Sequence, residues 1–366
     1  MSEPIRVMVV DDSAVIRGLI TRALETDPAI SVVASVQDGQ MAIRTVSRED
    51  IEVVVLDIEM PVMDGLTALP KLIQAKPGIQ VIMASTLTRK NADVSLRALQ
   101  GGAADYVAKP SSRADLHSAN DFQRELTEKV KAVGQAKRGG GGAKAPFRAA
   151  RRSAPSIGGS GPTSISLRQQ RIARPSAIAI GSSTGGPQAL LNVLSSLPGD
   201  MREPVFITQH MPATFTSLLA EHIDRASPLS CSEAKHNERV AEGHIYVAPG
   251  DYHMEIVREK ASLFIRLNQN QPENFCRPAV DPMLRSLAKV YGPKLLVTIL
   301  TGMGADGCKG SEVVVGAGGT VIAQDEPSSV VWGMPGAVAN AGLCSAVLPL
   351  NEITPYIRNL LMRSAA

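Results

Sequence analysis

The stretch AIGSSTGGPQAL, residues 179–190, sets three hydroxyl side chains among glycines directly after an apolar run. Gly181 and Gly186 have the spacing of a loop that holds a phosphate with its backbone amides. Such a loop needs a lysine after its final glycine to reach the phosphate oxygens, and Pro187 stands there instead. We therefore do not expect this turn to bind a nucleotide.

The same turn also matches the pattern GxSxG, with Ser183 as the central serine. Between a strand and a helix, this pattern leaves the serine hydroxyl exposed on a sharp turn, and the amide of the next residue, Thr184, can stabilise an oxyanion. We expect Ser183 to attack a carbonyl, with Ser182 and Thr184 as hydrogen-bonding neighbours. A plain strand-to-helix turn without chemistry is the alternative.

A serine nucleophile needs a general base, and the candidate is His210. Of the six histidines, it alone ends an apolar strand, in the stretch ITQHMP. Because the carboxyl ends of parallel strands share one edge of a sheet, His210 and Ser183 are predicted to lie close together. For an isolated residue, the alternative is a histidine that only packs at a strand end.

An acid that orients the histidine is expected at the same edge. The apolar run LLVTIL leads into TGMGADG, which places Asp306 in a glycine-rich loop. Asp281 competes, but it precedes Pro282 and a helical pattern, as a helix N-cap does, so we prefer Asp306. The glycines also allow the amide of Met303 to approach a reacting carbonyl.

A second group of chemically competent residues follows the strands of the N-terminal part. Three carboxylates at one edge repel one another, and a hard cation with oxygen ligands, such as Mg²⁺, relieves that repulsion. Asp57 then serves as a carboxylate nucleophile that forms an aspartyl phosphate. A lysine and a serine at the same edge are placed to contact its phosphoryl oxygens. The residues of this group are Asp11, Asp12, Asp57, Ser85 and Lys109.

Two α/β domains are needed to position these groups. In residues 1–128, five apolar runs alternate with amphipathic stretches, which predicts a doubly wound parallel sheet. Residues 176–366 repeat the alternation and add a hairpin, MEIVRE and SLFIRL, that turns near Lys260. Residues 129–175 are rich in Gly, Ala, Ser and Pro and predict a flexible linker.

Charge and composition exclude several classes of protein. The linker holds 11 Lys or Arg and no acid. Because the net charge of the whole chain is +3, the rest of the chain carries a net charge of −8. An acidic folded surface argues against binding of nucleic acid. No apolar stretch approaches the roughly 20 residues of a membrane span, so we expect no insertion. The four separated cysteines predict no zinc site and a reducing cytoplasm.

The N-terminal motifs VVDDSAVIR, VVVLDIEMPVMDG, MAST and YVAKP resemble the receiver domain of two-component response regulators, over about the first 125 residues. The resemblance implies a flavodoxin-like fold and phosphorylation of Asp57 by a histidine kinase. It also implies that Asp11, Asp12 and the backbone carbonyl of Glu59 lie near the Mg²⁺.

The C-terminal motifs resemble the catalytic domain of the chemotaxis protein-glutamate methylesterases, the CheB family, over residues 176–350. The motifs are IGSSTGGPQAL, ITQHMP, YVAPGDYHM, RPAVD, ILTGMGADG and GMPGAVA. The resemblance implies a Rossmann-like domain in which Ser183, His210 and Asp306 form the triad, with no cofactor. Ser182 stands where some relatives have alanine.

This resemblance also implies a reaction and partners. The substrates are glutamate methyl esters on chemoreceptors, which release methanol, and some receptor glutamines are deamidated. The unphosphorylated receiver covers the esterase site. A response regulator without enzymatic activity is the rival: a DNA-binding output is disfavoured by the acidic charge, whereas a partner-binding module with an inactive site is not excluded by the sequence.

Overall fold

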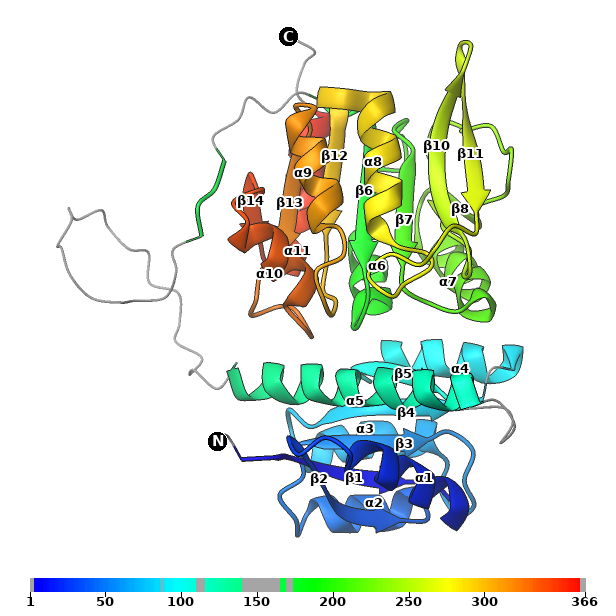
Figure 1. Ribbon diagram of the computed structural model, residues 1–366, viewed down its shortest axis with the longest axis vertical. Helices are drawn as coiled ribbons and strands as arrows, with labels where there is room; N and C mark the ends of the chain where they lie inside the picture. Colours follow the sequence, from blue (N-terminus) through cyan, green and yellow to red (C-terminus); the bar gives the residue numbers. More distant parts are fainter. Residues whose placement is uncertain (1–2, 87, 110–115, 140–164, 169–173, 363–366) are drawn as a thin grey trace, which may run out of the picture.

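The computed structural model shows two α/β domains stacked one on the other, with the N-terminal domain below and the C-terminal domain above (Figure 1). None of the helices in the described part of the chain is long and apolar enough to span a membrane. The described residues are 3–86, 88–109, 116–139, 165–168 and 174–362.

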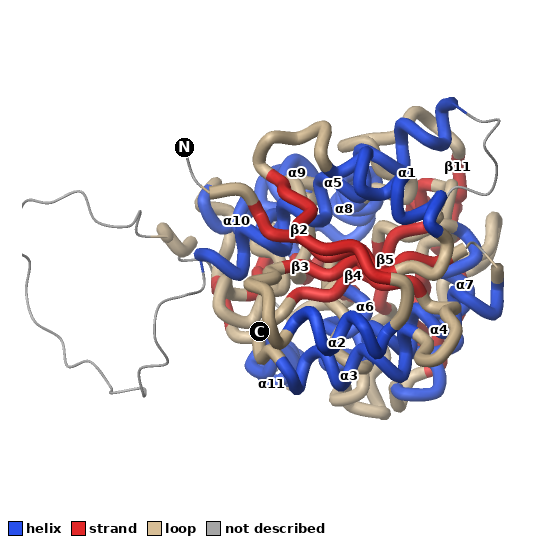
Figure 2. The backbone as a smooth tube through the Cα atoms, turned by 90° about the horizontal axis from the view of Figure 1, so that it is seen from below, coloured by secondary structure: helices blue, strands red, loops and turns tan. Residues whose placement is uncertain are grey.

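The N-terminal domain is a five-stranded parallel sheet in the order β2-β1-β3-β4-β5. Helices α2 and α3 cover one face and α1 and α5 the other (Figure 2). Because both faces are covered, the central strands are continuous apolar runs and not alternating ones. Their elements are β1 (Ile5–Val10), α1 (Ala14–Leu24), β2 (Ile30–Val36), α2 (Gly39–Val46), β3 (Val53–Asp57), α3 (Gly65–Ala75), β4 (Gln80–Ser85), α4 (Arg89–Gln100), β5 (Asp105–Ala108) and α5 (Leu116–Gly139).

The C-terminal domain is a seven-stranded parallel sheet in the order β14-β13-β12-β6-β7-β9-β8. Its strands are β6 (Ala177–Ser182), β7 (Val205–Gln209), β8 (Ser230–Glu233), β9 (His244–Val247), β12 (Leu295–Ile299), β13 (Thr320–Gln324) and β14 (Ala346–Leu348). Its helices are α6 (Gly186–Leu194), α7 (Ala213–Ala226), α8 (Val280–Tyr291), η1 (Gly292–Lys294), α9 (Cys308–Gly316), α10 (Gly333–Asn340) and α11 (Leu350–Leu361). The predicted fold class, two parallel-sheet α/β domains, is confirmed.

The predicted hairpin is also present, as the antiparallel pair β10 (His253–Glu259) and β11 (Ser262–Asn268). It turns at Lys260, which has a φ of 54°. The two strands form a sheet of their own beside the seven-stranded one. The hairpin packs on α8, which in turn covers the central strands of the large sheet.

The predicted domain boundary at residue 128 is wrong, because helix α5 continues to Gly139. Val130 and Val133 are fully buried and extend the apolar stripe of Phe122 and Leu126 at helical spacing. The last turns of α5 are rich in lysine and arginine and so resemble the linker in composition, although only the face of the helix opposite these valines is polar. Most of the predicted linker, 140–164 and 169–173, lies outside the described residues.

The two domains share a packed interface. Tyr106 of β5 stacks on Phe215 of α7, with ring centroids 4.2 Å apart, and both rings are buried. The imidazole of His222 on α7 lies between Asp93 and Gln100 of α4, at 3.0 and 3.2 Å. One hydrophobic cluster runs without interruption from α4 into α6 and α7. Helix α5 and strand β5 therefore face the carboxyl edge of the second sheet.

Candidate active site

The turn between β6 and α6 presents the candidate nucleophile. Strand β6 ends at Ser182, and Gly185 caps α6 with a φ of 75°, a left-handed conformation that glycine adopts at no steric cost. A side chain there would also collide with Val330. The amide of Ser183 donates to the carbonyl of Thr301 at 3.1 Å, which ties the turn to the loop after β12.

The three hydroxyls of this turn have different surroundings. Ser182 is buried and donates to the Oε1 atom of Gln209 at 2.7 Å. Thr184 is buried and donates to Asp105 of the N-terminal domain at 2.6 Å. The hydroxyl of Ser183 lines a cavity and makes no hydrogen bond with any residue in the described part of the chain. Of the three, Ser183 is the one available to a substrate.

His210 follows β7, the strand that pairs with β6, so the predicted shared edge is confirmed. Its amide donates to the carbonyl of Ser182 at 3.2 Å. The Nε2 atom lies 2.7 Å from Oδ2 of Asp306, and Nδ1 lies 3.4 Å from Sγ of Cys276. Burial by itself lowers the pKa of His210, but the contacts with Cys276 and Asp306 outweigh it and raise the pKa to about 10.

Asp306 is 1% exposed and accepts several hydrogen bonds besides that of His210. The amides of Val280, Asp281 and Gly307 donate to its two oxygens at 2.6, 3.1 and 2.9 Å. Burial alone raises the pKa of this carboxyl, but the hydrogen bond from His210 and these amides hold it below its usual value. Asp306 is thus an ionised carboxylate aimed at the imidazole.

The expectation that Asp281 caps its helix is wrong. Helix α8 begins at Val280 with Ala279 as the N-cap, so Asp281 lies inside the first turn. Its carboxylate accepts from the amide of Gly310 at 2.6 Å and does not cap α8. The proline after Asp281 marked a helix start that lies two residues earlier than the sequence indicated. The preference for Asp306 agrees with the geometry, since Asp306 carries the contact with His210.

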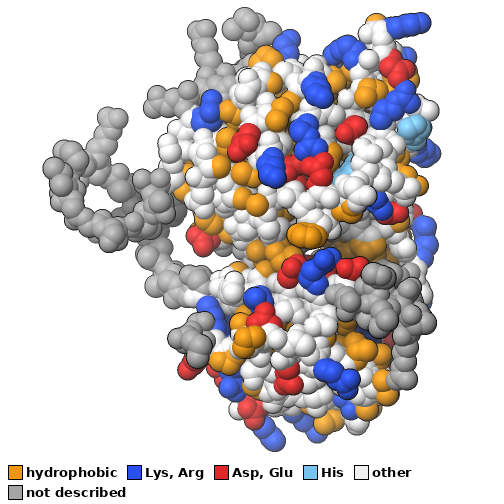
Figure 3. Space-filling model, viewed as in Figure 1, with side chains coloured by type: hydrophobic (Ala, Val, Ile, Leu, Met, Phe, Trp, Pro, Cys, Tyr) orange, Lys and Arg blue, Asp and Glu red, His pale blue; other side chains and the backbone are white. Residues whose placement is uncertain are grey.

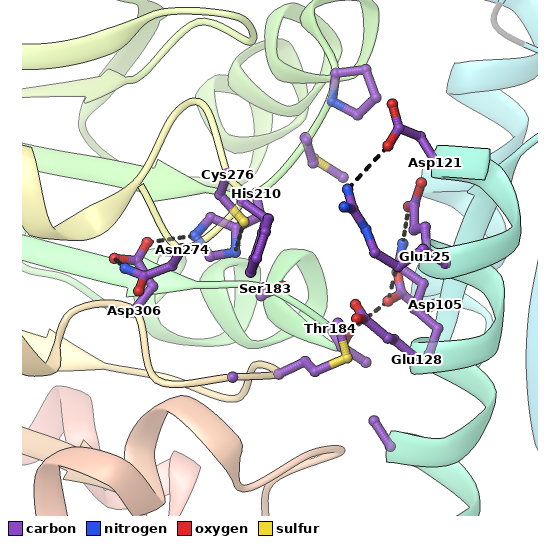
Figure 4. Close-up of a pocket in the computed structure, with 18 of the residues that line it drawn as sticks. Asp105, Asp121, Glu125, Glu128, Ser183, Thr184, His210, Asn274, Cys276 and Asp306 are labelled. Atoms are coloured by element: carbon purple, nitrogen blue, oxygen red, sulfur yellow. Dashed lines mark hydrogen bonds and ion pairs between the residues drawn. The ribbon is translucent and has the colours of Figure 1, made fainter. Parts of the chain in front are cut away.

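A cavity of about 850 Å³ joins these residues to the N-terminal domain. Figure 4 shows Ser183 and His210 on the side of the C-terminal domain, opposite Glu125 and Glu128 of α5. Figure 3 shows charged side chains of both signs along the groove between the two domains. A substrate that reaches Ser183 has to share this space with helix α5.

The predicted oxyanion donors border the same cavity. Thr184 and Met303 both line it, and their backbone amides donate to no other residue among those described. The loop of Met303 comes close to the nucleophile because Gly302 has no side chain: a Cβ atom there would lie 2.9 Å from Cβ of Ser183. Both amides are therefore free to donate to a ligand.

The predicted acidic cluster of the N-terminal domain is also assembled. Carboxylate oxygens of Asp11, Asp12 and Asp57 lie within 4.8 Å of one another. The Nζ atom of Lys109 is 2.5 Å from Asp11 and 2.6 Å from Asp57. Burial raises the pKa of Asp57, although Lys109 opposes this shift. Three convergent carboxylates suit a hard cation such as Mg²⁺.

Ser85 and Glu59 lie at the rim of this cluster with other partners. The Ser85 hydroxyl, buried at the end of β4, donates to the carbonyls of Thr86 and Asn91 at 3.1 and 3.4 Å. The Glu59 side chain is exposed and forms an ion pair of 3.5 Å with Lys90. A hydrogen bond from Ser85 to a phosphoryl group and a metal contact from the Glu59 carbonyl both stay predictions.

Several residues that touch the site carry no sequence signal. Asn274 and Cys276 contact Asp306 and His210 from a short turn without periodicity. Asp105 reaches Thr184 from the other domain. A contact between domains depends on how they dock, which no local pattern encodes.

The fold and the site define a class: a receiver domain joined to an α/β domain with a serine, a histidine and an aspartate around one cavity. The family models agree, since residues 7–121 match the response regulator receiver domain and residues 178–357 match the CheB methylesterase. The chain belongs to the CheB methylesterase family.

Relatives cover the chain from end to end. The "Protein-glutamate methylesterase/protein-glutamine glutaminase of group 2 operon" of Rhodospirillum centenum is 58% identical, over 100% of this chain and 96% of that protein. The "Protein-glutamate methylesterase/protein-glutamine glutaminase 1" of Paramagnetospirillum magneticum is 57% identical, over 99% and 97%. The crystal structure of the Thermotoga maritima CheB methylesterase catalytic domain is 41% identical and has a TM-score of 0.50, covering 51% of this chain and 98% of that one.

Proposed function

We propose that this protein is a chemotaxis methylesterase that hydrolyses glutamate methyl esters on chemoreceptors and deamidates receptor glutamines, under control of its receiver domain. The names of the relatives support both activities. The observation that carries the proposal is the free hydroxyl of Ser183 on the cavity that His210 and Asp306 also line.

In the proposed reaction, the Ser183 hydroxyl attacks the side-chain ester carbonyl while His210 takes its proton. The tetrahedral oxyanion accepts hydrogen bonds from the amides of Thr184 and Met303. His210 returns the proton to the departing methanol, which leaves an acyl-enzyme. Water, deprotonated by His210, then releases the glutamate and restores the serine. With glutamine as substrate, ammonia is the leaving group.

Asp306 acts through His210 and not on the substrate. Its carboxylate fixes the orientation of the imidazole and stabilises the imidazolium that forms during each proton transfer. The backbone amides around Asp306 keep it ionised, so the proton stays on His210 and is available to the leaving group.

The receiver supplies the regulation. A histidine kinase is the proposed phosphodonor and Asp57 the acceptor, with Lys109 and Ser85 as contacts of the phosphoryl oxygens. Asp11, Asp12, Asp57 and the Glu59 carbonyl would hold a Mg²⁺ ion, which neutralises charge on the incoming phosphoryl group.

Inhibition in this proposal comes from helix α5, which forms one wall of the cavity before Ser183. Phosphorylation must favour a state in which α5 has moved away. A complete switch from 1:99 to 99:1 requires about 5.5 kcal/mol, so we expect partial activation by a single phosphoryl group. A cytoplasmic location is part of the proposal, since all four cysteines are free thiols, as in a reducing compartment.

The test is methanol release from methylated receptors by the full chain, with and without a small-molecule phosphodonor. We expect release that the phosphodonor increases. Binding of receptor without methanol or ammonia release would instead identify a partner-binding module with an inactive site.

A further inference from the structure

The short turn Glu273–Cys276 is built to hold two side chains against the candidate active site. The amides of Glu273 and Cys276 donate to each other's carbonyls at 3.1 and 2.9 Å. The two residues between them, Asn274 and Phe275, both have left-handed backbones, with φ of 53° and 63°. Two successive residues with positive φ cost strain in a chain without glycine. A favourable contact must therefore offset that strain.

Asn274 makes that contact by joining two buried carboxylates. Its Nδ2 atom donates to Oδ1 of Asp306 at 2.9 Å and to Oδ2 of Asp281 at 3.1 Å. Both aspartates are 1% exposed. An amide carries two N–H groups, so it can serve one carboxylate with each. Figure 4 shows Asn274 beside Asp306, on the far side from Ser183.

Asp281 in particular needs such a donor, because Asp306 also has His210 and three backbone amides, whereas among the described residues Asp281 accepts otherwise only from the amide of Gly310. Burial and the charge on Asp306 both raise the pKa of Asp281. The charge of Arg285 on α8 attracts Asp281, but its guanidinium donates to the carboxylate of Glu273, at 2.9 Å. Other titratable groups near the pair are His210, which contacts Asp306, Cys276, which contacts His210, and Cys308 at the start of α9.

We propose that Asn274 is a positioning residue of the active site, which keeps Asp306 ionised and turned toward His210 next to a second carboxylate. The proposal rests on the proposed esterase function. While Asn274 binds Oδ1 of Asp306, the other oxygen is left for the imidazole. Without it, Asp281 and Asp306 would share a proton, and Asp306 would lose its hold on His210.

The test uses the full chain with Asn274→Gly. Glycine adopts the left-handed backbone of this turn readily, so the substitution removes the amide and spares the turn. Asn237→Gly is the matched control, since Asn237 also has a left-handed backbone, with φ of 64°, is exposed and does not line the cavity. Loss of a hydrogen bond to a buried charge predicts a fall in kcat/KM for methanol release of about 10- to 100-fold in Asn274→Gly. The control is expected to stay within about twofold.

The pH profile separates positioning from a merely structural role. Without Asn274, Asp306 holds His210 less firmly, and the contact with Asp306 is one cause of the raised pKa of that imidazole. The acid limb of kcat/KM should therefore move to lower pH in Asn274→Gly. Adding Asp281→Asn to Asn274→Gly removes the competing charge and should move the limb back. A uniform loss with an unchanged limb, or an equal loss in Asn237→Gly, would overturn the proposal.

A second measurement does not depend on the substrate. In NMR spectra of the full chain, the signal of the imidazole proton between His210 and Asp306 should be lost as the pH is lowered and Asp306 takes up a proton. This loss should occur at a higher pH in Asn274→Gly than in the unmodified protein. If the unmodified protein releases no methanol, the proposed function fails, and this signal still decides the role of Asn274. The same pH dependence in both proteins would refute it.

Discussion

The hydroxyls of the β6–α6 turn show how much single residues can be assigned from sequence. The GxSxG spacing singled out Ser183, and the structure gives its neighbours, Ser182 and Thr184, other partners. Nothing in the sequence predicted those partners, Gln209 and Asp105, because both lie far along the chain. The roles that depend on strand ends could be predicted, and those that depend on long-range contacts could not.

Ser183→Ala should abolish methanol release without changing the melting temperature, because its hydroxyl makes no hydrogen bond among the described residues. Ser182→Ala should keep activity. It leaves a buried acceptor on Gln209 unpaired, which predicts a loss of about 1–3 kcal/mol in the free energy of unfolding. Methanol assays and thermal melts of the two variants check this, and methanol release by Ser183→Ala would remove Ser183 as the nucleophile.

Cys276→Ala should extend activity to lower pH. The contact between Cys276 and His210 is one cause of the raised pKa of that imidazole. His210 accepts a proton only in its neutral form, so activity appears as pH rises through this pKa. A lower pKa therefore moves the acid limb of kcat/KM to lower pH. Cys308→Ala, which lies away from His210, is the control, and a limb that does not move in Cys276→Ala contradicts the assignment.

At the scale of elements, the sequence predicted strands better than boundaries. Continuous apolar runs and glycine-rich turns predicted both parallel sheets, because burial on two faces leaves a strong signal. The sequence predicts a linker from residue 129, whereas helix α5 continues to Gly139. Its last turns are amphipathic and lysine-rich, so composition resembled that of the linker. The turn Glu273–Cys276 was missed because its conformation depends on a tertiary contact of Asn274.

The contact between strand β5 and the nucleophile turn predicts a gain of basal activity in Asp105→Ala. Asp105 accepts from Thr184 at 2.6 Å and lies 3.4 Å from Lys129. Losing a buried hydrogen bond to a charge weakens docking by about 1.5–3 kcal/mol. Methanol release without phosphodonor should therefore rise, by up to about 10- to 100-fold. Glu125→Ala also removes a partner of Lys129, at 2.8 Å, without such a contact, and should not match this rise.

At the scale of the whole molecule, the proposed phosphorylation site and the candidate esterase site lie in different domains, and helix α4 connects them. Ser85, at the edge that holds Asp57, donates to the carbonyl of Asn91 in the first turn of α4. Two residues further on, Asp93 binds His222 of α7. A Ser85 hydroxyl that turns toward a phosphoryl group must leave α4, so in the proposed regulation phosphorylation would act directly on a helix of the domain interface.

A small-molecule phosphodonor should therefore raise methanol release by the full chain, and Asp57→Asn should remove this response while keeping the basal rate. Chelation of divalent cations should have the same effect as Asp57→Asn, because three carboxylates converge where the phosphoryl group arrives. Ser85→Ala tests the path to the interface: it should still take up phosphate at Asp57 but respond less. Hydrogen exchange in α4 and α7 should rise with phosphodonor in the unmodified protein only. If Ser85→Ala is activated as fully as the unmodified protein, the signal crosses between the domains by another route, and helix α5 and strand β5 also line the cavity before Ser183.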